Sequence, residues 1–184
     1  KFPTSVVVYG ATVDWDPRLT DFVDLEVELA VVIGRRPRRF SEAQAPAHIL
    51  GYTCLNDVSA RDLKFSVGQY VRSKSLDTFC PVGPVVVTAD ELTDPGDLAV
   101  RSYRNGEVMQ DSRTSNLIFS VPFLVAFCSE AFTLEPGDLI CTGTPSGVGW
   151  FREPKVLMRD GDVMAVEVEG IGRLTNPCRE VRAG

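Results

Sequence analysis

The feature of this sequence that most restricts its fold is a series of short apolar stretches, each entered through a tight turn. Three turns share one format, at residues 94–97, 135–138 and 160–162. In the first two, Pro followed by Gly fits the central positions of a type II turn, where only the second residue needs a positive φ. No βαβ alternation is visible. The pattern therefore predicts a strand-rich, rolled-up architecture with few helices.

Individual elements follow from hydrophobic periodicity. Residues 24–33 alternate at first and then become apolar on both faces, which is typical of a strand entering a buried sheet. Residues 98–103 and 107–110 flank Asn105-Gly106, a dipeptide that favours a type I′ hairpin turn. The strongest helix pattern covers residues 122–132. Its predicted buried stripe consists of Leu124, Phe127, Cys128 and Ala131.

Composition limits the class of protein. The 184 residues suit one domain, and a net charge of −6 argues against nucleic acid as a partner. No apolar run approaches the length of a membrane helix. The five cysteines are an odd number without a Cys-x-x-Cys pair, which favours buried thiols in a reducing compartment and hence the cytoplasm. Because the chain begins at Lys1 rather than Met, we expect an upstream segment to be missing.

Three carboxylates form the candidate metal site. Glu26 and Glu28 stand at i and i+2 of the predicted strand, so both project from one face, about 6.6–7 Å apart along the chain. Clustered carboxylates near an apolar region repel each other unless a cation neutralises them. Oxygen ligands favour magnesium, manganese or calcium over zinc. The alternative is an edge strand with a wet face. Asp57, at the end of another predicted strand, offers a third ligand, or else caps the turn at residues 59–62.

Other polar residues are ambiguous by themselves. Lys74 reads as an exposed loop lysine. The glycine-rich segment 143–149 matches neither a P-loop nor a Rossmann fingerprint, although its backbone N–H groups could approach a small anion. The lone histidine, His48, is more typical of a structural role, and triads or His-based zinc sites are unsupported.

Taken together, four ordered motifs resemble the fumarylacetoacetate hydrolase superfamily. They are residues 24–34, which contain the two glutamates, residues 51–62, residues 74–84 and residues 134–149. The resemblance implies an α+β, β-rich fold around a rolled mixed sheet with few short helices. It also implies one catalytic domain over residues 1–184 and a homodimer.

The resemblance further implies one magnesium ion, with manganese or calcium as alternatives. Glu26, Glu28 and Asp57 match the metal carboxylates of the family. Lys74 matches the catalytic lysine that faces the substrate, and Thr144 matches the threonine that helps to hold the substrate's carboxylate. Arg61 matches an arginine near the substrate pocket, but a structural ion pair with Asp62 or another acid is an equal alternative.

The function implied by the resemblance is metal-dependent C–C bond cleavage of small 2-oxo acids through a metal-stabilised enolate. The substrates would be acylpyruvates, which are hydrolysed, or oxaloacetate, which is decarboxylated. Alternatives are an isomerase or decarboxylase of unsaturated 2-oxo dicarboxylates such as 2-hydroxyhepta-2,4-diene-1,7-dioate, and a non-catalytic metal-binding member. The family's hydrolases carry a His and a Glu on an upstream mobile segment, which nothing in this sequence matches.

Overall fold

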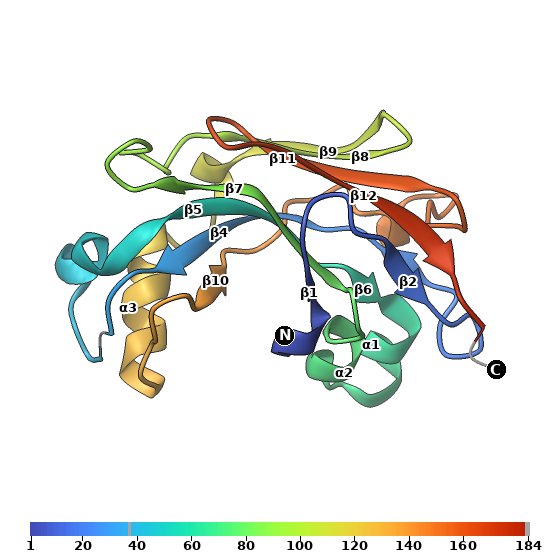
Figure 1. Ribbon diagram of the computed structural model, residues 1–184, viewed down its shortest axis with the longest axis horizontal. Helices are drawn as coiled ribbons and strands as arrows, with labels where there is room; N and C mark the ends of the chain where they lie inside the picture. The colour runs from blue at the N-terminus through green and yellow to red at the C-terminus, as the bar shows by residue number, and fades with distance from the viewer. Residues whose placement is uncertain (37, 183–184) are drawn as a thin grey trace.

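The computed structural model describes residues 1–36 and 38–182, and it contains two five-stranded sheets (Figure 1). The first sheet has the order β1 (Val6–Val7), β7 (Cys80–Thr88), β5 (Ile49–Asn56), β4 (Val27–Ile33) and β10 (Leu139–Cys141). The second has the order β2 (Val13–Trp15), β12 (Gly172–Glu180), β11 (Val163–Val168), β8 (Ala99–Arg104) and β9 (Glu107–Arg113). β3 (Val23–Asp24) and β6 (Ser59–Ala60) form a separate pair.

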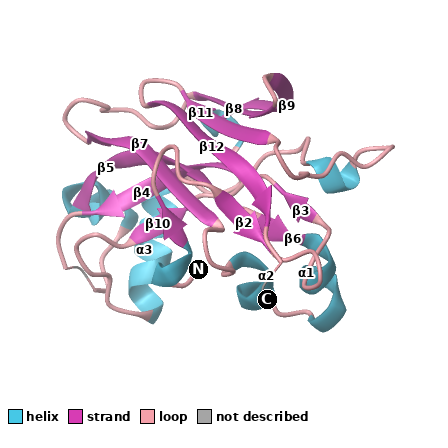
Figure 2. Cartoon of the chain, turned by 45° about the vertical axis from the view of Figure 1, so that its right-hand side comes forward, coloured by secondary structure: helices cyan, strands magenta, loops and turns pink. Residues whose placement is uncertain are grey.

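Helices are few and short (Figure 2). The α-helices are α1 (Arg61–Val67), α2 (Tyr70–Lys74) and α3 (Val121–Ala131). The 3-10 helices are η1 (Pro3–Ser5), η2 (Glu42–His48), η3 (Thr114–Asn116) and η4 (Gly149–Phe151). No helix in the described ranges is long and apolar enough to cross a membrane.

The two sheets share one hydrophobic core. Residues of β4 and β5 pack in the same buried cluster as residues of β8, β11 and β12. Both sheets are mixed, because β1 runs parallel to β7 and β2 runs parallel to β12 while the other pairs are antiparallel. Figure 1 shows α3 below one end of the rolled sheets and α1 and α2 below the other. This is the β-rich, rolled architecture that the turn pattern predicts.

Strand β4 has the character that its sequence predicts. All seven of its residues are buried, and it lies between β5 and β10 rather than at an edge. Val27 and Leu29 face the core, while Glu28 lies on the opposite face of the strand. The predicted hairpin is also present, since β8 and β9 pair through Asn105 and Gly106, both with positive φ. An edge strand with a wet face is therefore excluded for β4.

Two local predictions need correction. The buried residues of α3 are Val121, Val125, Ala126 and Ser129. Of the predicted stripe, Leu124 and Cys128 are partly buried against the core, but Phe127 is 61% exposed and Ala131 is exposed too. The helix packs against η2. The second concerns Gly96, whose φ is not positive, because the Asp94 side chain accepts a hydrogen bond from its backbone N–H and shapes the turn instead. Gly137 does have a positive φ, as a type II turn requires.

Candidate metal and substrate site

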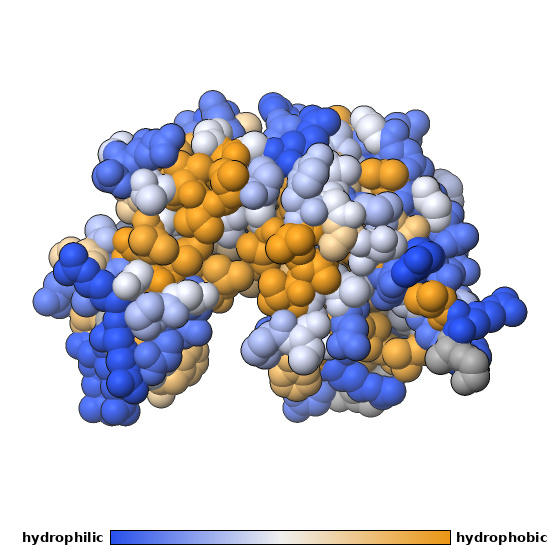
Figure 3. All heavy atoms as spheres, viewed as in Figure 1, coloured by the Kyte–Doolittle hydropathy of each residue, from blue (hydrophilic) through white to orange (hydrophobic). Residues whose placement is uncertain are grey.

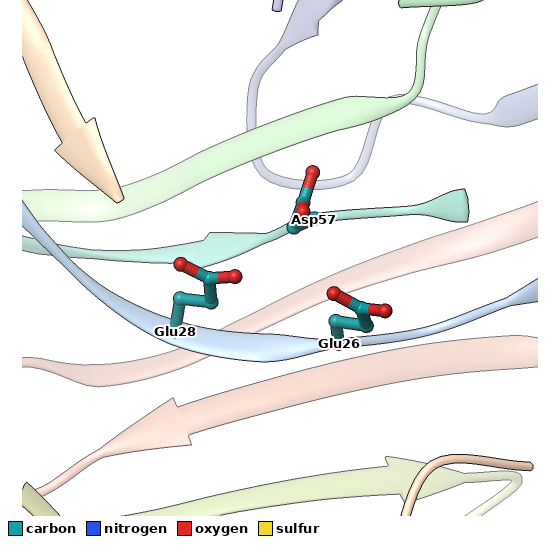
Figure 4. Close-up of side chains that lie close together, drawn as sticks. All are labelled: Glu26, Glu28 and Asp57. Atoms are coloured by element: carbon teal, nitrogen blue, oxygen red, sulfur yellow. The ribbon is translucent and has the colours of Figure 1, made fainter. Parts of the chain in front are cut away.

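Three carboxylates converge where β4 and β5 lie side by side. Glu28 is on β4, Glu26 is the residue directly before β4, and Asp57 follows the last residue of β5. In Figure 4 the two glutamate side chains extend from their strand toward the end of the strand that carries Asp57. One oxygen from each residue lies within 4.8 Å of the others. Glu26 and Glu28 are each only 5% exposed.

Burial and mutual repulsion affect these acids differently. Burial and the charge of Asp57 raise the pKa of Glu28 to about 8, from an ordinary value of 4.5. Its hydrogen-bond donor is the backbone N–H of Gly143, at 2.7 Å. Among the described residues, no lysine or arginine pairs with Glu28. Burial also acts to raise the pKa of Asp57, but the ammonium groups of Lys1 and Lys74 outweigh it and hold that pKa below its usual value.

Lys74 lies inside the site rather than in an exposed loop. It is the last residue of α2, and its Nζ donates to Glu26 Oε2 at 2.7 Å and to Asp57 Oδ2. Burial would lower its pKa, but the two carboxylates outweigh burial and raise it. Lys74 is therefore a firmly protonated ammonium between two acids.

Lys1 supports the same corner from the start of the chain. Its Nζ lies 2.8 Å from Asp57 Oδ1 and also donates to the carbonyl oxygens of Val58 and Phe79. The Asp57 carboxylate therefore forms ion pairs with two ammonium groups, those of Lys1 and Lys74. No side chain caps α1 in the described structure, so the helix-capping alternative for Asp57 is not realised.

Arg61 is held by two acids, neither of which is Asp62. Its Nη1 lies 2.6 Å from Glu26 Oε1, and its Nε donates to Asp24 Oδ2 at 3.0 Å. Asp24 is fully buried and also accepts from the backbone N–H groups of Gly149 and Trp150. Asp24 therefore joins Arg61 to the end of the glycine-rich segment.

The glycine-rich segment carries Thr144 and is fixed by Gln110 of β9. Gln110 Nε2 donates to Thr144 Oγ1 at 2.7 Å and to the Pro145 carbonyl at 2.8 Å. A Cβ on Gly149 would lie 1.8 Å from the Val156 carbonyl oxygen and 2.9 Å from Asp24, which explains glycine there. The N–H groups that could have bound a free anion at Gly143 and Gly149 instead serve Glu28 and Asp24.

A cavity of about 500 Å³ adjoins these residues. Its lining includes Glu26, Arg61, Lys64, Thr144 and Phe151. Larger hollows elsewhere on the surface lack this combination of charged groups, and Glu26 does not line them. Concave sites with a few converging polar groups are the usual location of small-ligand binding.

The donor set fits a hard divalent cation. Its three candidate ligands are carboxylates, which favour magnesium, manganese or calcium. The raised pKa of Glu28 marks a negative charge that the chain's own cations leave uncompensated. Lys74 neutralises part of the cluster, so an ion that binds all three carboxylates must displace it from at least one oxygen.

Fold and site together define a β-rich domain with a cluster of three carboxylates that could hold a metal ion, beside a cavity. The family model described as fumarylacetoacetate (FAA) hydrolase C-terminal matches residues 1–179. The chain belongs to this family, as its four motifs predict.

Named relatives are similar over nearly the whole chain. The oxaloacetate tautomerase YisK of Bacillus subtilis is 43% identical over 176 residues, which are 96% of this chain and 58% of that protein. The fumarylacetoacetate hydrolase structure from Exiguobacterium antarcticum has a TM-score of 0.95 at 42% identity, covering 98% of this chain and 65% of that one. The 2-hydroxyhepta-2,4-diene-1,7-dioate isomerase structure from Mycobacterium marinum has a TM-score of 0.89 at 47% identity, covering 96% of this chain and 66% of that one.

These comparisons confirm the predicted fold class. The chain spans between 50% and 69% of the length of the curated relatives it matches.

The structure brings all six sequence-predicted site residues into one region. Glu26, Glu28, Asp57, Arg61 and Lys74 are linked directly or through one neighbour, and Thr144 lines the same cavity as Glu26 and Arg61. Sequence reasoning missed four residues, of which two left a signal: Asp24 continues the period-two row of Glu26 and Glu28, and Lys64 follows Arg61 by three residues on a helix. The other two, Lys1 and Gln110, act across large sequence separations.

Proposed function

We propose that this chain is a metal-dependent enzyme domain that acts on small 2-oxo acids through their enolate, by C–C bond cleavage of oxaloacetate or acylpyruvates. The observation that carries the proposal is the convergence of three carboxylates with the ammonium of Lys74, beside a cavity lined by Glu26 and Thr144. A divalent ion, which we take to be magnesium, would be held by Glu26, Glu28 and Asp57, and would supply a Lewis acid for the developing enolate charge.

The chain's own residues provide binding and proton transfer. Thr144 Oγ1 accepts a hydrogen bond from Gln110, so the hydroxyl proton of Thr144 is available to donate to a substrate carboxylate. Arg61, which is paired with Asp24 and Glu26, holds the Glu26 carboxylate in place at the cavity wall. Lys74, once freed from an acid oxygen, carries a proton that it can give to the substrate carbon after the bond breaks.

A second candidate is proton transfer without bond cleavage. The name of the Bacillus subtilis relative, oxaloacetate tautomerase, and that of the Mycobacterium marinum isomerase favour it. Both reactions pass through the same enolate and use the same residues. A non-catalytic metal-binding domain would bind magnesium and convert neither kind of substrate.

The decisive assay gives the chain magnesium with oxaloacetate and separately with acetylpyruvate. Release of carbon dioxide indicates decarboxylation, and a carboxylate product indicates hydrolysis. A change in ultraviolet absorbance without either product indicates tautomerisation. Hydrolysis also needs a base for water, and the chain's one histidine, His48, contacts Phe40 instead of lining the cavity. We therefore expect residues 1–184 to convert oxaloacetate and to hydrolyse acetylpyruvate poorly.

Lys74→Met tests the proposed proton donor. We expect turnover to fall by a factor of about 10²–10⁴, while magnesium binds equally well or more tightly because a competing ammonium is gone. Lys155→Met removes a lysine that lies over the Trp150 ring outside the cavity lining, and it serves as the matched control. Turnover that survives Lys74→Met, or that needs no divalent ion, would refute the proposal.

Assembly and location complete the proposal. We propose a homodimer, supported by exposed apolar side chains such as Phe2 and Phe132, which line a hollow of about 670 Å³. Figure 3 shows that apolar residues gather on the face of the molecule turned toward the viewer. Light scattering during gel filtration measures the mass directly. The five free thiols support location in a reducing compartment, which we propose to be the cytoplasm. We also propose that residues 1–184 form one catalytic domain.

A further inference from the structure

We propose that Lys64 forms an anion subsite on the cavity wall, which holds the distal carboxylate of a 2-oxo dicarboxylate. This inference rests on the function proposed above and deepens it by naming the residue that selects, among the proposed substrates, those with a second carboxylate. It predicts that the site prefers a second carboxylate over a neutral tail.

The position of Lys64 follows from helix geometry. It stands three residues after Arg61 on α1, so both side chains lie on one face of the helix. Arg61 reaches inward to Glu26, and Lys64 lines the same cavity one turn further along. A substrate whose 2-oxo acid end lies near Glu26 and Thr144 would extend its other end along this wall.

Charge pairing distinguishes Lys64 from the other cations of the site. Arg61 pairs with Asp24 and Glu26, and Lys74 pairs with Glu26 and Asp57. Within the described part of the chain, Lys64 has neither a carboxylate nor a carbonyl partner. Its neighbour is the ring of Tyr70, whose centroid lies 4.7 Å from Nζ. Lys64 is thus the cavity-lining cation left without an anion.

The surroundings of Lys64 make an anion favourable there. The side chain is half-buried, and partial loss of water lowers its pKa despite the attraction of Glu26. An ammonium that has lost part of its hydration gains more from a carboxylate than a fully solvated one does. Phe151, also in the lining and 75% exposed, offers an apolar surface for the carbon atoms between two carboxylates.

The test compares two stable ligands on the magnesium-loaded chain by isothermal titration calorimetry. Oxalate can bind the metal but has no distal group, whereas L-malate adds a distal carboxylate to a chelating 2-hydroxy acid. Lys64→Met removes the charge and Lys64→Arg keeps it. Lys155→Met is the matched control, because Lys155 also lies over an aromatic ring, 5.0 Å from the Trp150 centroid, but outside the cavity lining.

We expect Lys64→Met to weaken L-malate binding about 10- to 100-fold, the usual range for a hydrogen bond to a charged group. Oxalate binding should stay within about twofold, and Lys64→Arg should retain L-malate binding to within about threefold, as expected for a rim charge that remains in place. Equal weakening of both ligands, no weakening of either, or a wild-type chain that binds oxalate but not L-malate would each overturn the subsite. If no 2-oxo acid is turned over but L-malate affinity still follows the charge at position 64, the proposed function fails and the subsite stands.

Discussion

Glu28→Gln separates the metal requirement of the site from the stability of the fold. The glutamine oxygen can still accept the Gly143 N–H, so the loop contact at 2.7 Å is kept while the negative charge is removed. Without metal, the ionised, buried carboxylate of Glu28 destabilises the folded state, because it faces Asp57 and has no cation partner in the described structure. We expect the variant to be more stable than the wild type when metal is absent, and to bind magnesium poorly.

The pKa shift gives the size and the sign of the effect. The pKa of Glu28 rises from 4.5 to about 8 on folding, and each pKa unit corresponds to about 1.4 kcal/mol, which sets a ceiling of about 5 kcal/mol. Because the folded state binds this proton more tightly than the unfolded chain, its stabilisation is complete below pH 4.5 and is lost progressively as the pH rises to about 8. The ionised side chain relaxes toward water, so we expect about 2 kcal/mol in favour of Glu28→Gln at pH 8.5.

The assay is thermal and urea unfolding in EDTA at pH 5 and pH 8.5, then at pH 8.5 with magnesium. A gain of about 2 kcal/mol corresponds to about 4–8 °C in Tm for a chain of this size. At pH 5 the two proteins should nearly coincide, and magnesium should reverse the order by stabilising the wild type more. Glu130→Gln, at an exposed position of α3, is the control. A variant that is less stable than the wild type in EDTA at both pH values would refute the electrostatic reasoning.

Two further expectations concern the buried acids Asp24 and Glu28. Asp24→Asn removes the charge of the buried partner of Arg61, and it should lower the free energy of unfolding, measured in urea, by about 3–5 kcal/mol. Arg61→Met should lower the free energy of unfolding by a similar amount. A double variant whose loss equals the sum of the two single losses would show that the two side chains act independently. Magnesium binding at pH 7 should release about one proton per ion, because Glu28 must ionise to bind the ion. The proton release should vanish above pH 9 and in Glu28→Gln. Calorimetric titrations in buffers of different ionisation enthalpy measure the release, and magnesium binding without it would contradict the raised pKa of Glu28.

Elements with a clear period could be predicted from the sequence, and so could residues adjacent to them. Glu26 and Glu28 have a period of two, which predicts that both acids project from one face of the strand whatever the strand packs against. Asp24 continues the period, but it belongs to β3 and pairs with Arg61. The Asn105-Gly106 turn is equally local. Helix α3 shows the opposite case, because its sequence is apolar on almost every side and no period selects a face. Close packing on η2 selects the small residues, and Phe123 stacks between Phe119 and Phe127 instead.

The parts of the site that escaped prediction are contacts between distant segments. Lys1 reaches Asp57, and Gln110 reaches Thr144 across 34 residues. Nothing in the local pattern around either residue indicates its partner, because a single lysine or glutamine is normally solvated. Strand spacing and the family resemblance both indicated the candidate metal ligands, and the resemblance alone indicated Lys74. Neither indicated which residues would hold these side chains in place.

The balance of charge connects these observations. Four carboxylates and three cations make up the buried site: Asp24, Glu26, Glu28 and Asp57 against Lys1, Arg61 and Lys74. The one unmatched negative charge falls on Glu28. Burial raises the pKa of Glu28, and the charge of Asp57 adds to the rise, whereas the ammonium groups of Lys1 and Lys74 hold the pKa of Asp57 below its usual value. A bound divalent ion would overcompensate that charge by one unit, and the carboxylate of the proposed 2-oxo acid substrate would restore neutrality. Lys64, on the cavity wall, then remains as a positive charge without a partner, and a second carboxylate on the same substrate would neutralise it.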